Sequence, residues 1–173
     1  MNLKAFIILM MISSLDSRIT VDLQEMHGCP GHSYDIDFSN VEFDFDYDGY
    51  LIVSGNFTFL KDVVEPYAAY FHSDHMERGE WRPAIIHKNV PDFCAVIQSP
   101  LEVWYPVTQH LSKKRCPYKA GSVVHFDTVR YKFPVAITPN FLGEWRMFME
   151  QRDVTKDPKP FACLMQYFSV IEI

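Results

Sequence analysis

The chain has 173 residues and a formal net charge of −6, and this acidic balance argues against nucleic acid as a partner. Its length suits one domain with a single core. Residues 1–17 combine Lys4, an apolar stretch and a small, polar end, which is the pattern of a secretory signal peptide. The apolar stretch is too short to cross a bilayer about 30 Å thick. We therefore expect residues 18–173 to form one secreted, extracellular domain.

Strict alternation marks residues 41–48 as a half-buried strand with an acidic outer face. Val41, Phe43 and Phe45 share one side, and the residues between them are acidic. Asp48-Gly49 is a turn signal, and residues 50–60 resume a strand pattern, so the two runs predict a hairpin. Asn56-Phe57-Thr58 inside it is an N-glycosylation acceptor, which places Asn56 on a solvent-facing position.

The remaining strands are expected at residues 67–72, 81–88, 122–131, 144–152 and 161–172, with a turn at residues 78–80. Residues 89–111 differ, because prolines break any long element there while apolar residues persist. This segment predicts a short helix and loops that cover an opening. About seven short strands with regular turn signals predict an all-β fold, an Ig-like two-sheet β-sandwich.

The four cysteines, Cys29, Cys94, Cys116 and Cys163, all follow the expected signal peptide. An even number in an oxidising compartment predicts two disulfides. Of the three pairings that four cysteines allow, we favour Cys29 with Cys163, which joins the start of the domain to its last strand. Cys94 would then pair with Cys116 and close a local excursion. Zinc is disfavoured because no pair has the spacing that zinc sites usually show.

The segment from Cys116 to Gly121, Cys-Pro-Tyr-Lys-Ala-Gly, resembles the Cys-Pro-aromatic-Lys-x-Gly segment of the ML (lipid-recognition) superfamily, which includes the ganglioside activator of lysosomes. Residues 134–142 are similar to its Pro-x4-Pro-Ser-Trp-Leu loop, and residues 143–146 to its Gly-x-Tyr-Arg. The likeness covers roughly residues 26–173, although the activator has eight cysteines. Within the superfamily, the four cysteines, the signal and the acidic, aromatic composition are most similar to the insect chemosensory protein B family.

This resemblance implies a sandwich whose sheets splay to admit a lipid chain. The chain contains 14 Phe, 9 Tyr, 3 Trp and 8 Met, a set that could fill a close-packed core. Methionines on neighbouring strands could instead repack around an irregular apolar guest. Strand alternation and the matched loop give the candidate ligand-binding residues Phe43, Phe45, Trp104, Phe133, Phe141, Leu142, Met147, Met149 and Met165.

Phe141-Leu142 forms an apolar tip on a turn, where polar residues are usual. The matching tip of the activator is associated with membrane contact, so the resemblance implies that this loop forms the mouth of the cavity. The alternative is a loop folded back onto the core.

Catalysis finds little support in the sequence. His72-Ser73-Asp74-His75 resembles half a metal site but is expected in a polar loop, and there is no Gly-x-Ser-x-Gly nucleophile motif. Asp44, Asp46 and Asp48 share one strand face, where solvation is their ordinary role and calcium binding the alternative. We expect a protein that is not an enzyme and has no catalytic residue, cofactor or metal.

The sequence thus favours a secreted protein that binds an apolar lipid or hydrocarbon pheromone in chemosensory perception. Its expected partners are that ligand and, in addition, a membrane surface or a chemoreceptor. One alternative is a lipid-transfer activator that presents a membrane lipid to a hydrolase. Another is a protein-binding receptor co-ligand with a filled core and no exchangeable lipid.

Overall fold

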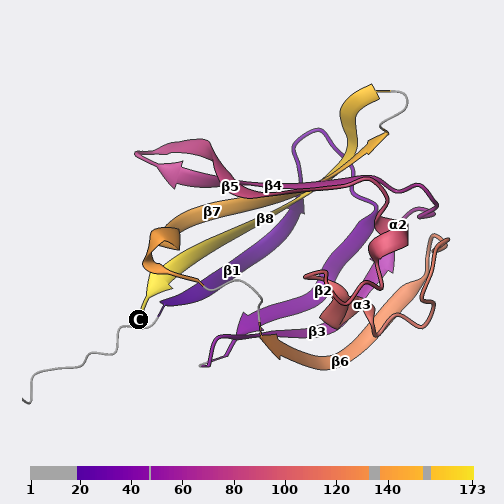
Figure 1. Ribbon diagram of the computed structural model, residues 1–173, viewed down its shortest axis with the longest axis horizontal. Coiled ribbons are helices and arrows are strands. Elements are labelled where there is room, and N and C mark those ends of the chain that lie inside the picture. Colours follow the sequence, from indigo (N-terminus) through magenta and orange to yellow (C-terminus); the bar gives the residue numbers. More distant parts are fainter. Residues whose placement is uncertain (1–18, 47, 133–136, 154–156) are drawn as a thin grey trace, which may run out of the picture.

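Two antiparallel sheets face each other in the computed structural model, which describes residues 19–46, 48–132, 137–153 and 157–173 (Figure 1). The larger sheet has the strand order β1 (Ile19–Gly28), β8 (Asp157–Glu172), β7 (Gly143–Asp153), β4 (Ala69–Glu77) and β5 (Glu80–Val90). The smaller sheet has the order β2 (Ile36–Phe45), β3 (Tyr50–Phe59) and β6 (Val123–Lys132). The prediction of an all-β, two-sheet sandwich is confirmed.

The hairpin expected from the alternating residues is formed by β2 and β3, in which Phe43 lies opposite Val53. Val41, Phe43 and Phe45 are half-buried and face the core, whereas Glu42 and Asp44 are exposed, as their alternation predicts. Gly49 in the connecting turn has φ 76°, a conformation that favours glycine. This hairpin supplies two of the three strands of the smaller sheet.

The strand β1 was not predicted. It pairs with β8 at the edge of the larger sheet, with Val21 opposite Val170. A strand pattern is present in the sequence, because Ile19, Val21 and Leu23 alternate with polar residues. It was missed because it directly follows the expected signal peptide. In addition, a register shift between Leu23 and Met26 interrupts the alternation.

The other strands lie close to their expected positions, and the turn between β4 and β5 falls at Arg78 and Gly79, which have φ 53° and 83°. The proline-containing segment forms two one-turn helices, α2 (Phe93–Val96) and α3 (Tyr105–Thr108). A short 3₁₀ helix, η1 (Pro139–Phe141), precedes β7. The helices among the described residues are too short to cross a membrane.

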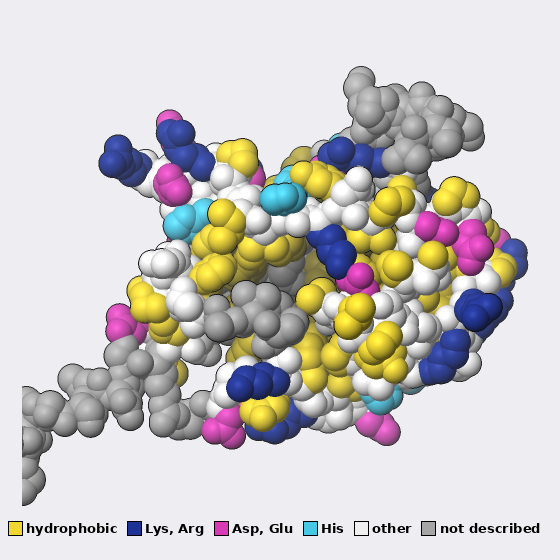
Figure 2. All heavy atoms as spheres, viewed as in Figure 1, with side chains coloured by type: hydrophobic (Ala, Val, Ile, Leu, Met, Phe, Trp, Pro, Cys, Tyr) yellow, Lys and Arg dark blue, Asp and Glu magenta, His cyan; other side chains and the backbone are white. Residues whose placement is uncertain are grey.

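The main core cluster lies between the sheets and draws its buried side chains from β3, from the loop between β3 and β4, from β6 and from the segment around α2 and α3. Its most deeply buried members are Val53, Val63 and Leu111, each no more than 2% exposed. The core is not filled throughout, because hydrophobic side chains surround a hollow between the two sheets on the face shown in Figure 2.

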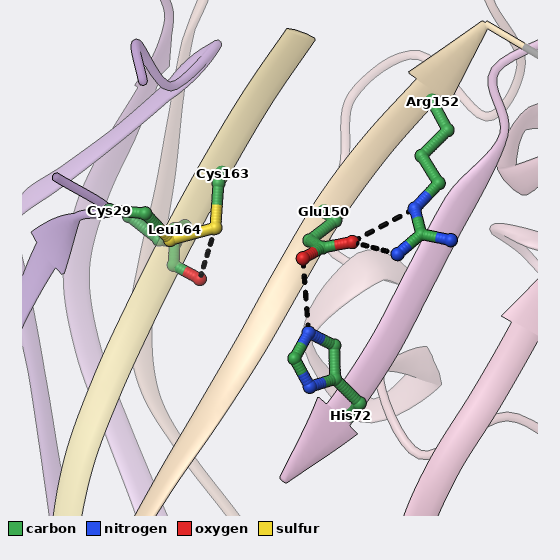
Figure 3. Close-up of a disulfide and its surroundings, with 6 residues drawn as sticks. All are labelled: Cys29, His72, Glu150, Arg152, Cys163 and Leu164. Carbon is green, nitrogen blue, oxygen red and sulfur yellow. Dashed lines mark hydrogen bonds and ion pairs between the residues drawn. A yellow bond between two sulfur atoms is a disulfide. The ribbon is translucent and has the colours of Figure 1, made fainter. Parts of the chain in front are cut away.

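The two disulfides are those favoured from the sequence, Cys29–Cys163 and Cys94–Cys116. The first joins the end of β1 to β8 near the outer face of the larger sheet (Figure 3). The second joins Cys94 of α2 to Cys116 over a sequence separation of 22 residues, and the stretch between them contains α3. Disulfides of this kind are typical of proteins in oxidising compartments.

Candidate ligand-binding cavity

A cavity of about 330 Å³ lies between the two sheets. Side chains of both sheets and of the α2–α3 segment line it, and none of the described lining residues is charged. The lining residues are Met26, Ile36, Phe38, Val41, Phe43, Val53, Phe57, Phe59, Val63, Tyr67, Phe71, Phe93, Ile97, Val103, Trp104, Val107, Thr108, Leu111, Tyr118, Phe126, Tyr131, Met147, Met149, Leu164 and Gln166.

Alternation along the strands places these side chains in the cavity. On β7, Met147 and Met149 face inward, and on the neighbouring β8 Leu164 and Gln166 do so. On the opposite sheet, Val53, Phe57 and Phe59 of β3 are buried, and Thr58, between Phe57 and Phe59, is only half-buried. An apolar side chain at every second position gives each sheet one apolar inner face.

The α2–α3 segment covers the side of the cavity next to β4 and β5. The Trp104 ring stacks on Phe71 of β4, with centroids 5.6 Å apart, and contacts Phe93 of α2 at 5.0 Å. Lys88 of β5 lies 5.1 Å from the centroid of the same ring and forms an ion pair with Glu102. Trp104 therefore connects the covering segment to the larger sheet through aromatic and cation–π contacts.

Most polar groups in the cavity wall have partners in the protein. The Thr108 hydroxyl donates to the Ile97 carbonyl at 2.6 Å, and the Tyr118 hydroxyl donates to the Lys113 carbonyl at 3.0 Å. Gln166 Nε2 donates to the Tyr167 carbonyl at 2.8 Å. Burial raises the pKa of Tyr131 to about 12. The wall thus offers an apolar, low-dielectric environment.

Four of the predicted ligand-binding residues line the cavity, namely Phe43, Trp104, Met147 and Met149. Phe45 lies on the same face of β2 and packs against the core cluster, but it does not reach the cavity. Met165 faces the opposite side of β8, where it packs with the Cys29–Cys163 disulfide, because its neighbour Leu164 takes the inward position. Phe133 lies outside the described residues.

The loop that carries Phe141 and Leu142 is folded back, so the expectation that it forms the cavity mouth is not met. The Trp145 indole N–H donates to the Phe141 carbonyl at 2.7 Å, and the two rings lie 5.6 Å apart. His75 Nε2 is 3.3 Å from the Leu142 carbonyl oxygen. Phe141 therefore packs on a side chain that is only 4% exposed, and neither Phe141 nor Leu142 lines the described cavity.

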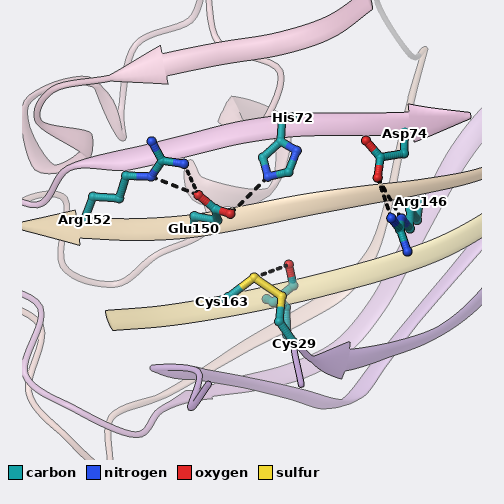
Figure 4. Close-up of polar contacts among 8 residues, drawn as sticks. Cys29, His72, Asp74, Arg146, Glu150, Arg152 and Cys163 are labelled. Atoms are coloured by element: carbon teal, nitrogen blue, oxygen red, sulfur yellow. Dashed lines mark hydrogen bonds and ion pairs between the residues drawn. A yellow bond between two sulfur atoms is a disulfide. The ribbon is translucent and has the colours of Figure 1, made fainter. Parts of the chain in front are cut away.

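The His72–His75 motif lies on β4 and not in a polar loop. His72 Nε2 is 3.1 Å from Glu150 Oε1, and Asp74 forms an ion pair with Arg146, both on the outer face of the larger sheet (Figure 4). Asp46 of the acidic strand is likewise paired, with Arg130 at 2.6 Å. Within the described ranges, no three His, Cys, Asp or Glu residues gather as they would around a metal ion.

The sequence reasoning missed several aromatic residues of β3, β6 and the loops that line the cavity. Phe57, Phe59 and Phe126 occupy alternating positions, so strand periodicity could have found them. Tyr67 and Tyr118 lie outside the strands of the structure, and neither the expected strand at residues 67–72 nor the motif at residues 116–121 indicates that their side chains enter the cavity wall. Their place in the cavity comes from tertiary contacts, such as the antiparallel bridge between Val63 and Tyr118.

No family model matches the chain, and no curated protein matches it either. Among solved structures, a Niemann-Pick type C2 protein from the Japanese carpenter ant is similar, with a TM-score of 0.33 and 12% sequence identity. The alignment covers 90% of this chain and 95% of that protein. A likeness this distant does not define a family or a ligand for this chain.

Proposed function

We propose that this protein is a secreted carrier that binds one apolar molecule reversibly and does no chemistry on it. The observation that carries the proposal is the cavity of about 330 Å³, whose described lining residues are uncharged and mostly aromatic or aliphatic. Burial of each methylene group contributes about 0.8 kcal/mol. Roughly ten buried methylenes would therefore give micromolar affinity without any polar contact.

Secretion is part of the proposal. It is supported by the signal-like N-terminus and by two disulfides that leave no free cysteine among the described residues. The resemblance of the motifs at residues 116–121 and 134–146 to the ML superfamily favours a lipid or hydrocarbon as the ligand. We extend the proposal to pheromone perception in chemosensory tissue because the composition is most similar to the insect chemosensory protein B family. N-glycosylation at Asn56, half-buried on the central strand β3, remains a prediction.

The first experiment identifies what the cavity holds. Residues 18–173 are expressed in a secretory host, and the purified protein is extracted with organic solvent for mass spectrometry. A stoichiometric apolar species supports a carrier. A clean extract together with no uptake of a fluorescent fatty-acid probe contradicts the proposal and favours the receptor co-ligand.

A substitution locates the ligand. Met147→Trp adds volume inside the cavity, so we expect weaker probe binding with a thermal midpoint close to that of the wild type. The matched control is Ile85→Trp, which adds the same side chain at a position that is 76% exposed. Equal effects of the two substitutions on binding would place the ligand outside the cavity.

A lipid-transfer activator is the second candidate, and binding at two pH values separates it from a carrier. Hydrolases of acidic compartments would use an activator whose lipid binding strengthens near pH 5. Probe affinity that is unchanged or weaker at that pH supports the carrier.

A further inference from the structure

One residue of the cavity wall, Val103, also lies on the surface of the protein. It lines the cavity and is 43% exposed. The other described lining residues are buried or half-buried. Leu101, in the same loop between α2 and α3, is 92% exposed. The cavity therefore reaches solvent at this loop.

The residues on either side of Val103 attach the loop to the larger sheet. Glu102 forms an ion pair with Lys88 of β5, and Trp104 packs on Phe71 of β4 with ring centroids 5.6 Å apart. Lys88 Nζ also lies 5.1 Å from the centroid of the Trp104 ring, so one lysine contacts both residues. We call Lys88, Glu102 and Trp104 the clasp.

The clasp accounts for the specific contacts of the loop with this sheet. In the described part of the chain, each hydrogen bond, ion pair and ring contact between residues 97–108 and β4 or β5 involves Glu102 or Trp104. Hydrogen bonds within the segment, such as Gln98 Nε2 to the Thr108 carbonyl at 2.6 Å, do not depend on the sheet. The loop can therefore move away from β4 and β5 and keep its own hydrogen bonds.

The position and exposure of the clasp suit a contact that opens and closes. The Lys88 side chain is 44% exposed and that of Glu102 14%, so dissolved salt can screen their attraction. Phe71 and Trp104 both line the cavity, so separation of the two rings would widen the opening at Val103. Loops and lids move in this way on timescales from nanoseconds to milliseconds.

We propose that the clasp is a gate that sets how fast the apolar ligand enters and leaves, an inference that rests on the proposed function. The gate opens when the Lys88–Glu102 pair breaks and Trp104 separates from Phe71. Neither Lys88 nor Glu102 lines the cavity, so the pair stabilises the closed loop equally with and without ligand. Its loss should therefore raise the rates of entry and release together and leave the equilibrium affinity unchanged.

The test follows exchange of a fluorescent fatty-acid probe by stopped-flow mixing. Glu102→Gln should speed both entry and release about fivefold, the effect of one partly exposed ion pair, with an unchanged dissociation constant. The matched control is Glu80→Gln, which makes the same change in the exposed Arg82–Glu80 pair of β5 and should alter neither rate. Equal effects of the two substitutions, or faster release without faster entry, overturn the gate. A wild-type protein that binds no probe instead contradicts the proposed function.

Reversal of the charges separates the ion pair from other effects of substitution. Lys88→Glu should speed exchange, and its combination with Glu102→Lys should slow exchange again because opposite charges face each other once more. Added sodium chloride should speed release from the wild type but not from Glu102→Gln. A double variant that exchanges as fast as Lys88→Glu, or equal salt dependence of the wild type and Glu102→Gln, would show that the pair does not hold the gate and would overturn the inference.

Discussion

Arg146 on β7 forms an ion pair with Asp74 on β4, with 2.7 Å between Nη2 and Oδ2, while its guanidinium lies over the rings of Trp81 and Phe148. Arg152 repeats the arrangement with Glu150 and the Tyr70 ring. The His72 ring stacks on Phe148 at 4.5 Å. Cations and aromatic rings thus alternate across the outer face of the larger sheet and tie β4, β5 and β7 together.

Removal of Arg146 should destabilise the fold. Arg146→Ala leaves the Asp74 carboxylate, whose side chain is 13% exposed, without its partner and removes two ring contacts. We expect the free energy of unfolding to fall by about 2–3 kcal/mol, measured by urea denaturation. The control is Arg82→Ala, because the Arg82–Glu80 pair is largely exposed and should contribute less than about 1 kcal/mol. Similar decreases in the free energy of unfolding for the two variants would show that Arg146 stabilises the fold no more than an exposed ion pair does.

The Cys94–Cys116 disulfide should stabilise the protein and hold the α2–α3 segment over the cavity. Replacing both cysteines by serine restores the entropy of a 22-residue separation in the unfolded chain and should cost about 3 kcal/mol. Since the segment holds Trp104 over the cavity, ligand release should also be faster, as stopped-flow probe displacement would show. Loss of stability without faster release would mean that the segment does not limit access. Removal of Cys29–Cys163, with its separation of 134 residues, should cost more stability, about 5 kcal/mol.

The folded-back loop leads to a prediction about Phe141. Phe141→Asp removes a ring that packs on Trp145, so we expect a loss of about 1–2 kcal/mol in stability with ligand affinity unchanged. Leu101→Asp is the control, because Leu101 is 92% exposed and its replacement should leave the thermal midpoint unchanged. An unchanged midpoint and weaker vesicle or lipid binding for Phe141→Asp would restore the mouth assignment.

Stability should fall at alkaline pH. Burial raises the pKa of Tyr131 from 10.0 to about 12, so the folded state keeps a proton that the unfolded chain loses first. The unfolded state then binds fewer protons, and the free energy of unfolding decreases as the pH rises from about 10 to about 12. Burial also raises the pKa of Tyr67 and Tyr118. Urea titrations across this range should give a shallower decline for Tyr131→Phe than for the wild type. Parallel declines would show that this phenol does not contribute.

Strand periodicity predicted most of the fold because it is a local property. The hairpin of β2 and β3 follows from the alternation at Val41, Phe43 and Phe45, and the inward positions of Met147 and Met149 follow from the same rule. Met165 shows where the rule was misapplied. It has the opposite parity to Leu164, so it faces outward with Cys29 and Cys163, and a shift of one residue reverses the face of a strand residue.

The rest of the site depends on contacts between segments far apart in the chain. Nothing in the sequence around Tyr67 indicates that its side chain is buried in the wall of the cavity, or that Gln151 on β7 is only 2% exposed. The direction of the Phe141 loop was also undetermined, because an apolar turn tip packs equally well on a membrane or on its own Trp145. The likeness to the ML superfamily and to its insect branch stays a prediction.

The segment from Phe93 to Thr108 covers the cavity without joining either sheet. It is attached by the Cys94–Cys116 disulfide, by the Phe93 N–H to the Tyr67 carbonyl at 2.7 Å and by the Trp104 stack. Changes of length or sequence between these anchors would leave every pair of hydrogen-bonded strands intact. Sequence changes in this one short segment could therefore alter the shape of the cavity wall while the pairing of the strands is preserved.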